Sequence, residues 1–449
     1  MPLRWRYGCG MPALTRPRAI ATAIALTALL AGGCTGTTAT GGSTTGVSST
    51  IGGTTSSAST STGPAVSASA TPTGSGAATP TASTTSAGPT AGGGPAAYSQ
   101  CVTGTFAALS PDQRVGQLVM VGIQPAQPPA GIDGVLRAEH VGSVIYLGGW
   151  EGVSLVRSTS AHLQQTGSYA AGPGRLGMLV AADQEGGSVQ QLKGPGFTRL
   201  PTATTQGGWT VDRLRETGVA LGTELLDAGV NVNLAPVADT VPPSMTRTNQ
   251  PIGRYQRQFG TDPAVVGRAV PALVDGMQSR GVVATVKHFP GLGRVTGNTD
   301  VTAVGITDTT TGPDDPYLEP FQAGMRAGVG MVMVSSARYP TLDPSNQAVF
   351  SRPIITGLLR TQLGWTGVVI TDDVGAARAV SAVPPGDRAV RFLAAGGDIV
   401  LTAVPSQAAA MTAAVQARVA RDPEFAASVD ESVRRVLALK ERFAVLRCG

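Results

Sequence analysis

Residues 287–300 carry the side chains best suited to chemistry in this chain of 449 residues. They read KHFPGLGRVTGNTD and follow the apolar run 281–286, so we expect a buried strand to end where they begin. Lys287 and His288 stand at this strand end, and Asp300 follows on a glycine-rich loop. A lysine, a histidine and a carboxyl group in one place can hold a polar ligand and transfer a proton.

The region 99–449 alternates short apolar runs with amphipathic segments, a pattern typical of α/β folds. Eight runs read as buried parallel strands: 118–122, 142–147, 178–182, 230–235, 282–286, 331–334, 367–370 and 398–401. Helical segments are expected between them, for example 211–228 and 263–279, and two more at the end, 407–420 and 425–443.

Strands and helices that alternate eight times over this length predict a single (β/α)8 TIM-type barrel. A doubly wound open sheet is the competing architecture. No glycine-rich phosphate fingerprint follows the first strand, which counts against a dinucleotide-binding fold.

The active site of such a barrel lies at the carboxyl ends of its strands. Polar residues follow four of the expected strands at that end: 183–187 (DQEGG), 236–239 (PVAD), 287–288 (KH) and 371–373 (TDD). A single exposed strand end is often polar for solubility alone. Four together, with glycines that leave room for a ligand, predict one shared site.

These segments resemble family 3 glycoside hydrolases, in particular the bacterial β-N-acetylglucosaminidases. The matching motifs are 182–187 (ADQEGG), 233–239 (NLAPVAD), 252–253 (IG), 257–263 (RQFGTDP), 287–291 (KHFPG) and 371–373 (TDD). The resemblance extends over nearly all of residues 110–403 and implies an enzyme of the single-barrel type. It implies no metal and no other cofactor, and no His/Cys/Asp cluster with ligand spacing contradicts that.

The resemblance assigns Asp372, directly after the seventh strand, as the nucleophile that forms a covalent glycosyl-enzyme. Asp373 is the competing choice, but the family places the nucleophile first, and alternating side-chain directions at a strand end favour one of the two. The resemblance also implies four sugar-binding side chains, namely Asp183 as an acceptor and Arg257, Lys287 and His288 as donors.

For several of these residues a structural role competes with the functional one. Lys287 could be an ion-pair partner in the barrel interior, and His288 could be a buried histidine of the core. Glu185 and Asp239 could support the site or cap helices, and we assign them no chemistry. Gly186 and its neighbour are expected in a tight turn.

The loop departs from the family at its end. Where the typical enzyme reads Asp-Ser-His and uses the histidine as acid/base, this chain reads Asn298-Thr299-Asp300. Asp300 can be the acid/base if the closing loop buries its carboxyl group, with Asn298 at the position of the orienting aspartate. Alternatively the loop is degenerate and the protein binds sugars without turnover, or an acidic residue elsewhere donates the proton.

We favour Asp300 as the acid/base because a pure binding module has no use for Asp372. A carboxylate at this position would also repel anionic phosphate, so hydrolysis is favoured over phosphorolysis.

Residues 1–33 read as a secretory signal peptide. Arginines precede the apolar stretch 19–31, which ends in Gly-Gly before Cys34. Small residues before a cysteine resemble the lipobox of bacterial lipoproteins, so Cys34 is expected to be acylated, although Ala31 stands where that pattern usually has leucine. Plain secretion is the alternative, and Met11 competes with Met1 as the start.

Residues 34–98 follow with almost only Thr, Ser, Gly, Ala and Pro, and we expect them to be a disordered tether. Cys101 and Cys448 then remain at the two ends of the region 99–449. An even pair in an exported protein is a disulfide candidate; two free thiols are the alternative.

The net charge of +5 comes without a basic run in the region 99–449, and aromatic residues make up 4% of the chain. Neither property argues for nucleic-acid binding. Together with the signal-peptide pattern, the family resemblance implies a monomeric envelope lipoprotein, anchored to the outer face of the cytoplasmic membrane, that releases N-acetylglucosamine from cell-wall muropeptides or related glycans. The alternatives are an exo-β-glucosidase and a catalytically silent glycan-binding lipoprotein.

Overall fold

The computed structural model describes residues 98–449. The expected signal peptide, Cys34 with its expected acylation and nearly all of the expected tether lie outside the described residues. Within residues 98–449, no helix is both long enough and apolar enough to span a membrane.

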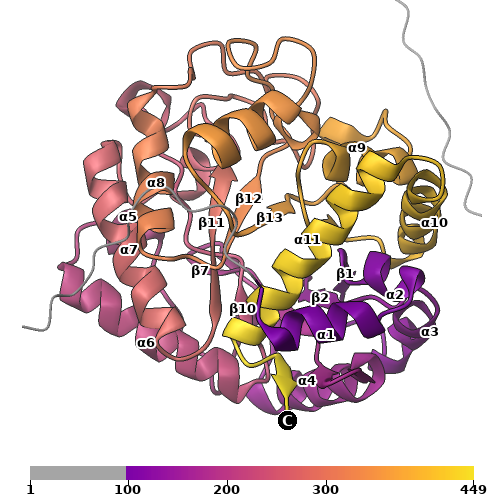
Figure 1. Cartoon of the computed structure of the whole chain (residues 1–449). Helices are drawn as coiled ribbons and strands as arrows, with labels where there is room; N and C mark the ends of the chain where they lie inside the picture. Colours follow the sequence, from indigo (N-terminus) through magenta and orange to yellow (C-terminus); the bar gives the residue numbers. More distant parts are fainter. Residues whose placement is uncertain (1–97) are drawn as a thin grey trace, which may run out of the picture. The chain divides into compact units, whose positions relative to one another are not determined.

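The eight predicted strands form one parallel sheet that curls into a nearly closed barrel (Figure 1). They pair in the order β13-β12-β11-β10-β6-β2-β1-β14, and a parallel bridge between Ile370 and Ile399 brings the two edges together. The strands are β1 (Val119–Ile123), β2 (Ser143–Tyr146), β6 (Leu179–Ala182), β10 (Val232–Asn233), β11 (Val283–Phe289), β12 (Met331–Val334), β13 (Val368–Thr371) and β14 (Val400–Thr402). The predicted TIM-type barrel is confirmed.

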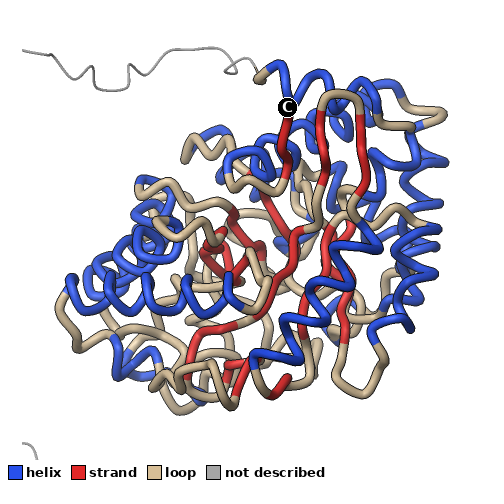
Figure 2. The backbone as a smooth tube through the Cα atoms, turned by 90° about the horizontal axis from the view of Figure 1, so that it is seen from below, coloured by secondary structure: helices blue, strands red, loops and turns tan. Residues whose placement is uncertain are grey.

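Helices surround the barrel on its outside, as the views from the front and from below show (Figures 1 and 2). Those that connect successive strands are α3 (Asp133–Ala138), α4 (Val153–Gly167), α6 (Val211–Asp227), α7 (Pro263–Gln278), α8 (Glu319–Arg326), η6 (Pro353–Gln362) and α9 (Pro385–Ala394). After β14 come α10 (Ala408–Val419) and α11 (Pro423–Arg442), close to the predicted bounds.

Helices α6 and α7 show how local sequence sets these elements. The Thr210 side chain accepts a hydrogen bond at the start of α6, and Asp262 does the same for α7, which begins with a proline. The two helices approach closely at Gly218 and Gly276, where a Cβ atom on Gly218 would lie only 3.0 Å from the Cα atom of Gly276. Glycine at both positions therefore permits the close helix packing.

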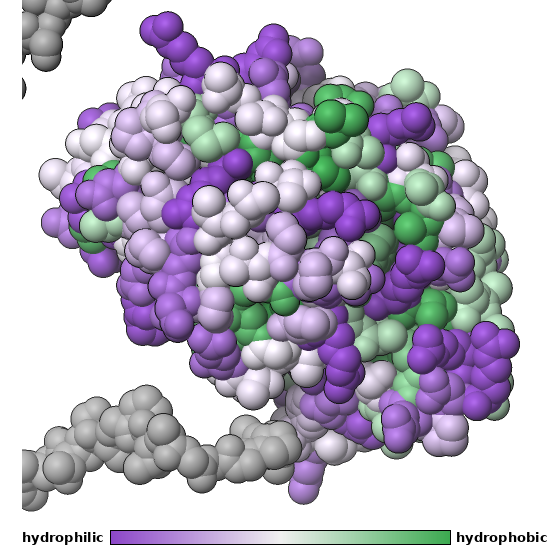
Figure 3. Space-filling view, turned by 90° about the horizontal axis from the view of Figure 1, so that it is seen from above, coloured by the Kyte–Doolittle hydropathy of each residue, from purple (hydrophilic) through white to green (hydrophobic). Residues whose placement is uncertain are grey.

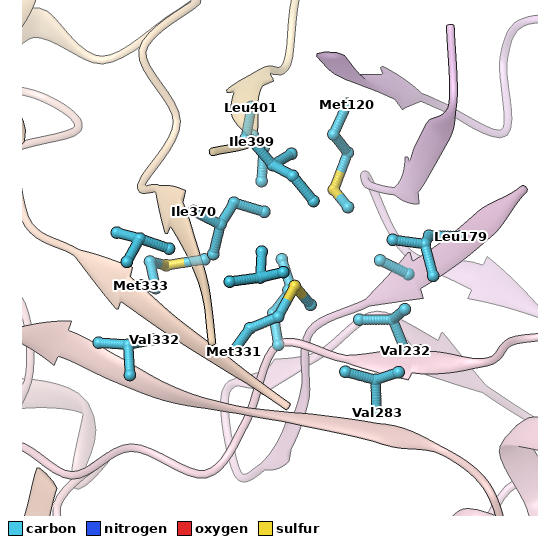
Figure 4. Close-up of a cluster of buried hydrophobic side chains, with 14 of the residues drawn as sticks. Met120, Leu179, Val232, Val283, Met331, Val332, Met333, Ile370, Ile399 and Leu401 are labelled. Carbon is cyan, nitrogen blue, oxygen red and sulfur yellow. The ribbon is translucent and has the colours of Figure 1, made fainter. Parts of the chain in front are cut away.

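Apolar side chains fill the barrel interior (Figure 4). Met120, Leu179, Val232, Met331 and Ile370 come from five different strands and are all fully buried. The interior is therefore a packed core, and a ligand can bind only at an end of the barrel.

The two ends of the described region are joined. Helix α1 (Gln100–Ala108) lies against α11, and the last strand, β15 (Leu446–Cys448), pairs with β5 (Gly174–Leu176) of a hairpin completed by β4 (Tyr169–Ala171). Cys101 and Cys448 form a disulfide whose Cα atoms lie 5.9 Å apart. The hairpin was not predicted, because its strands are too short to show a periodic pattern.

One strand departs from the prediction in a way that affects the site. The sequence places the end of the fifth strand at Val286, but β11 continues to Phe289, and its pairing with β12 shifts register between these two residues. Lys287 and His288 therefore belong to the strand itself.

Seen from above, apolar patches on the surface are separated by polar and charged residues (Figure 3).

Candidate active site

One cavity of about 310 Å³ opens among the carboxyl ends of the barrel strands. This volume is at the lower limit of ligand pockets, which measure roughly 300–1,000 Å³. All seven catalytic and binding residues named from the sequence line it, namely Asp183, Arg257, Lys287, His288, Asn298, Asp300 and Asp372. The barrel thus brings together residues that are up to about 190 positions apart in the chain.

Lys287 lies at the base of this pocket between two carboxylates. Its Nζ atom is 2.6 Å from Oδ1 of Asp183 and 2.7 Å from Oε1 of Glu185, and only 2% of its side chain is exposed. Burial alone would lower the pKa of Lys287, but the two carboxylates outweigh it and raise the pKa above its ordinary value. Lys287 is therefore an ion-pair partner of the interior and a pocket residue at once.

Glu185 joins Lys287 to Arg257. Both oxygens of Glu185 accept from the guanidinium of Arg257, at 2.9 Å from Nε and 2.8 Å from Nη2. Burial raises the pKa of Glu185, but Arg257 and Lys287 outweigh it and lower the pKa to about 2. Glu185 is thus a fixed negative charge that orients two hydrogen-bond donors, a role that its motif alone did not reveal.

His288 is oriented by Asp239, to which the sequence assigned no chemistry. Its Nδ1 atom lies 2.7 Å from Oδ2 of Asp239, and its backbone N–H donates to Oδ1 at 3.2 Å. A carboxylate at Nδ1 favours a proton on that nitrogen and leaves Nε2 for the pocket. Nε2 lies 3.5 Å from Nη2 of Arg257, so the histidine and the arginine converge on the same space.

Asp372 and Asp373 follow β13 but have different surroundings. The oxygens of Asp373 accept three backbone N–H groups, from Gly375 at 2.7 Å, Ala376 at 3.0 Å and Ala403 at 2.8 Å. Within the described residues, Asp372 accepts only the N–H of Asp373, at 2.8 Å. The carboxylate of Asp372 thus keeps free lone pairs that can point into the pocket.

Burial raises the pKa of Asp372 to about 6. The neighbouring His288 opposes this rise, and the neighbouring Asp300 adds to it. The two carboxyl groups are therefore close enough to influence each other, as an acid and a nucleophile on one bond must be.

Asp300 itself is exposed, which differs from the expectation that the loop buries its carboxyl group. The chain bends at Asn298, whose side-chain oxygen accepts the N–H of Asp300 at 3.0 Å. Asn298 therefore shapes a turn of the loop backbone through a bond to the main chain of Asp300.

The loop is fixed at both ends. At its start, the N–H of Leu292 donates to Asp239 at 2.7 Å. Near Asp300, the carbonyls of Thr299 and Asp300 accept the backbone N–H groups of Ala379 and Arg378 at 3.0 and 2.9 Å. These backbone bonds place Asp300 at the rim of the pocket, independently of its side chain.

No group of three or more His, Cys, Asp or Glu side chains in residues 98–449 is arranged to hold a metal ion. The polar residues of the pocket are instead donors and acceptors suited to a ligand with many hydroxyl groups. Gln191 also lines the pocket, while its Oε1 atom accepts the N–H of Gly149 at 3.1 Å.

Comparison with known proteins agrees with this geometry. Residues 110–439 match the profile described as the glycosyl hydrolase family 3 N terminal domain. A beta-hexosaminidase from Stenotrophomonas maltophilia (strain K279a) is 37% identical over 250 residues, which cover 54% of this chain and 71% of that protein.

Two solved structures are similar as well. The beta-N-acetylhexosaminidase from Beutenbergia cavernae DSM 12333 is 45% identical with a TM-score of 0.69, and the match covers 74% of this chain and 99% of the other. A family 3 beta-N-acetylglucosaminidase from Paenibacillus sp. str. FPU-7 is 31% identical with a TM-score of 0.65, covering 75% and 63%. The chain belongs to glycosyl hydrolase family 3 and is a glycoside hydrolase.

Proposed function

We propose that this enzyme is a retaining exo-β-N-acetylglucosaminidase that releases terminal N-acetylglucosamine through a covalent intermediate on Asp372. The observation that carries the proposal is the contrast between the two aspartates after β13. Backbone donors occupy both oxygens of Asp373, whereas Asp372 keeps free lone pairs beside Asp300. The names of the two similar solved structures, at 45% and 31% identity, support the acetylated sugar.

In the first step, a carboxylate oxygen of Asp372 forms a bond to the anomeric carbon while the bond to the leaving oxygen breaks. Asp300 gives its proton to that oxygen, so the aglycone leaves as a neutral alcohol. In the second step, Asp300 takes a proton from water, and the resulting hydroxide oxygen displaces Asp372. The ester carries no charge, so Asp300 can ionise in the intermediate without facing a second carboxylate.

Asp300 is exposed where it lines the pocket, and a bound sugar would remove water from its carboxyl group. A proton donor must be protonated at the start of the reaction, and desolvation favours its neutral form. Substrate binding is thus expected to supply the burial that the loop alone does not.

The other end of the pocket would hold the sugar hydroxyls. Asp183 has one oxygen bound to Lys287, and no hydrogen bond within the described residues uses the other, which can accept from a hydroxyl group. Lys287 and Arg257 would donate to the same ring, and His288 would donate or accept at its Nε2 atom. Because Glu185 and Asp239 already fix the orientation of these side chains, sugar binding would cost little side-chain entropy.

We also propose that the enzyme is exported and anchored through a lipid on Cys34, and that cell-wall muropeptides are its substrates. The disulfide between Cys101 and Cys448 supports export, because such bonds persist in oxidising compartments. Mass spectrometry of the mature N-terminus would test the anchor. An unmodified cysteine or an intact residue 1–33 segment would exclude it.

The rival function is an exo-β-glucosidase. Comparing the hydrolysis of a matched glucoside and N-acetylglucosaminide would separate the two activities. For turnover, a fluorinated, slowly hydrolysed N-acetylglucosaminide should leave a covalent label on the peptide that contains Asp372. Absence of label under turnover conditions would contradict the proposal.

The acid/base assignment is tested with Asp300→Ala. A general acid contributes roughly 10²–10⁴-fold, so activity on a substrate with a poor leaving group should fall by that factor. Activity on a substrate whose leaving group needs no proton should fall much less. Full activity of Asp300→Ala on the poor leaving group would show that another residue donates the proton.

A further inference from the structure

Asn249 is a fully buried polar residue outside the pocket whose side chain makes four hydrogen bonds. Its Nδ2 atom donates to the carbonyl of Leu292 at 2.7 Å and to that of Val295 at 2.8 Å. Its Oδ1 atom accepts the N–H groups of Ile252 at 3.0 Å and Gly253 at 2.7 Å. The amide therefore uses both of its donor hydrogens and both lone pairs of its acceptor.

The two segments that Asn249 joins carry different parts of the site. Residues 251–257 bring Pro251 and Arg257 to the pocket, and residues 292–300 bring Leu292 and Asp300. The first segment would hold the sugar, and the second would deliver the proton. Asn249 lies between them and bonds to the backbone of both.

Only an amide fits these four bonds. The two carbonyls need donors, while the two N–H groups need an acceptor, and an asparagine supplies both from one short side chain. A carboxylate of the same shape would place a negative oxygen against two carbonyl oxygens. Since a buried polar group without a partner is destabilising, the arrangement would shift rather than keep such a contact.

We propose that Asn249 is a positioning residue that sets the distance between the sugar held by Arg257 and the proton donor Asp300. This inference rests on the proposed function, because it takes Asp300 as the acid/base. Asn249 touches neither the pocket nor the substrate. It acts through the backbone of the two segments, so its loss should misplace Asp300 relative to the glycosidic oxygen.

The test compares Asn249→Asp with wild type on two N-acetylglucosaminides, one with a poor leaving group and one with an activated leaving group. Misplacement by about 1 Å can cost up to roughly 100-fold, so kcat on the poor leaving group should fall about 10- to 100-fold. On the activated substrate kcat should change less than about threefold, while KM rises for both substrates because the Arg257 segment also shifts. Equal loss of kcat on both substrates would overturn the proposal.

Asn231→Asp is the matched control. The Asn231 side chain also bridges two backbone groups, accepting from Val180 at 2.8 Å and donating to Met178 at 3.0 Å, but it lies at the opposite end of the barrel strands. The same isosteric change there should leave the ratio of the two kcat values unchanged. A selective loss in this control would show that the effect of Asn249→Asp reflects general damage to the fold.

A double variant separates failure of this inference from failure of the proposed function. If Asn249 acts through Asp300, then Asn249→Asp should cause no further loss of kcat on the poor leaving group in the Asp300→Ala background. A further loss of the same size would overturn the inference. Full activity of Asp300→Ala alone would instead overturn the acid/base assignment, whatever Asn249→Asp does.

Two further measurements keep the test decisive if Asn249→Asp does not fold. Asn249→Ala leaves a small polar space that water can enter, and it should show the same selective loss. In the wild type, the amides of Ile252 and Gly253 donate to Asn249 alone among the described residues and should exchange slowly with solvent hydrogen. Rapid exchange at both amides would show that the hydrogen bonds from Ile252 and Gly253 to Asn249 do not persist in solution.

Discussion

Two buried lysines at opposite ends of the barrel have opposite electrostatic surroundings. Lys287, at the carboxyl ends of the strands, touches the carboxylates of Asp183 and Glu185. Lys440, on α11, reaches residues that precede the strands at the other end, and it is fully buried. Its Nζ atom donates to Oε1 of Gln117 at 2.6 Å and to the carbonyls of Gly142 at 3.0 Å and Gly177 at 2.9 Å.

The two lysines show how burial changes the pKa of an amino group with and without an opposite charge nearby. No carboxylate within residues 98–449 pairs with Lys440, and burial lowers its pKa to about 7. Burial of Lys287 would do the same, but two carboxylates reverse the effect. The charge of Lys287 is thus maintained for a ligand, whereas Lys440 supplies hydrogen bonds that tie α11 to three segments before β1, β2 and β6.

The largest expected effect comes from replacing each lysine with methionine. Lys287→Met leaves Asp183 and Glu185 without this cation, and kcat/KM should fall about 100-fold or more, since loss of a buried charged partner costs roughly 2–5 kcal/mol. Lys440→Met should change kcat/KM less than about threefold, while lowering the free energy of unfolding by about 1–3 kcal/mol because three acceptors lose their donor. Steady-state kinetics would measure kcat/KM of the two variants, and urea unfolding would measure their free energies of unfolding. A similar loss of activity in the two variants would remove the functional distinction between the two ends.

Glu185→Gln tests whether the negative charge of Glu185, rather than its shape, holds Lys287 and Arg257 in position for the substrate. The amide retains the size of Glu185 but removes the charge that Lys287 and Arg257 share, so KM should rise about tenfold, as expected when a charged hydrogen bond becomes neutral. Glu431→Gln is the control, because Glu431 also pairs with an arginine, Arg435 at 3.4 Å, outside the pocket. An unchanged KM for Glu185→Gln would mean that hydrogen-bond geometry alone is sufficient.

The pH dependence of stability should reveal Lys440. Its pKa is lower in the folded state than in the unfolded chain, so between about pH 7 and 10 the unfolded chain binds more protons. The contribution of Lys440 to stability therefore rises with pH, by at most about 1.4 kcal/mol per pH unit, and is flat below pH 7. The difference in unfolding free energy between wild type and Lys440→Met should follow this slope. A difference independent of pH would show that Lys440 titrates normally.

Asp372 provides a third case, in which burial and a neighbouring like charge act together. Because its pKa is raised to about 6, kcat/KM on an activated substrate should fall as pH decreases through about 6. Asp300→Asn removes the like charge and should move this acidic limb to lower pH, by less than about one unit. A pH–rate profile of the two proteins measures the shift. An unmoved limb would show that Asp300 and Asp372 do not interact.

Much of the fold was predictable because its signals are local. Each strand of the barrel is a short apolar run, and polar residues at the strand ends marked where the site would form. The amphipathic pattern located helices α6 and α7 to within a residue, and the structure adds their capping residues, Thr210 and Asp262. The β4/β5/β15 sheet escaped prediction because each strand has only three residues and depends on a partner far away in sequence.

The chemical types in the site were thus determined by the sequence alone: a lysine and histidine on one strand, two aspartates after another, and a carboxyl group where a histidine was expected. Only the tertiary structure decided which of them touch. Glu185 meets Arg257 across 72 positions, and Asn249 meets Leu292 across 43. Asp300 lies exposed at the rim. Such contacts form only when the barrel closes, because closure places the ends of distant strands within hydrogen-bond distance and sets how much water each group retains.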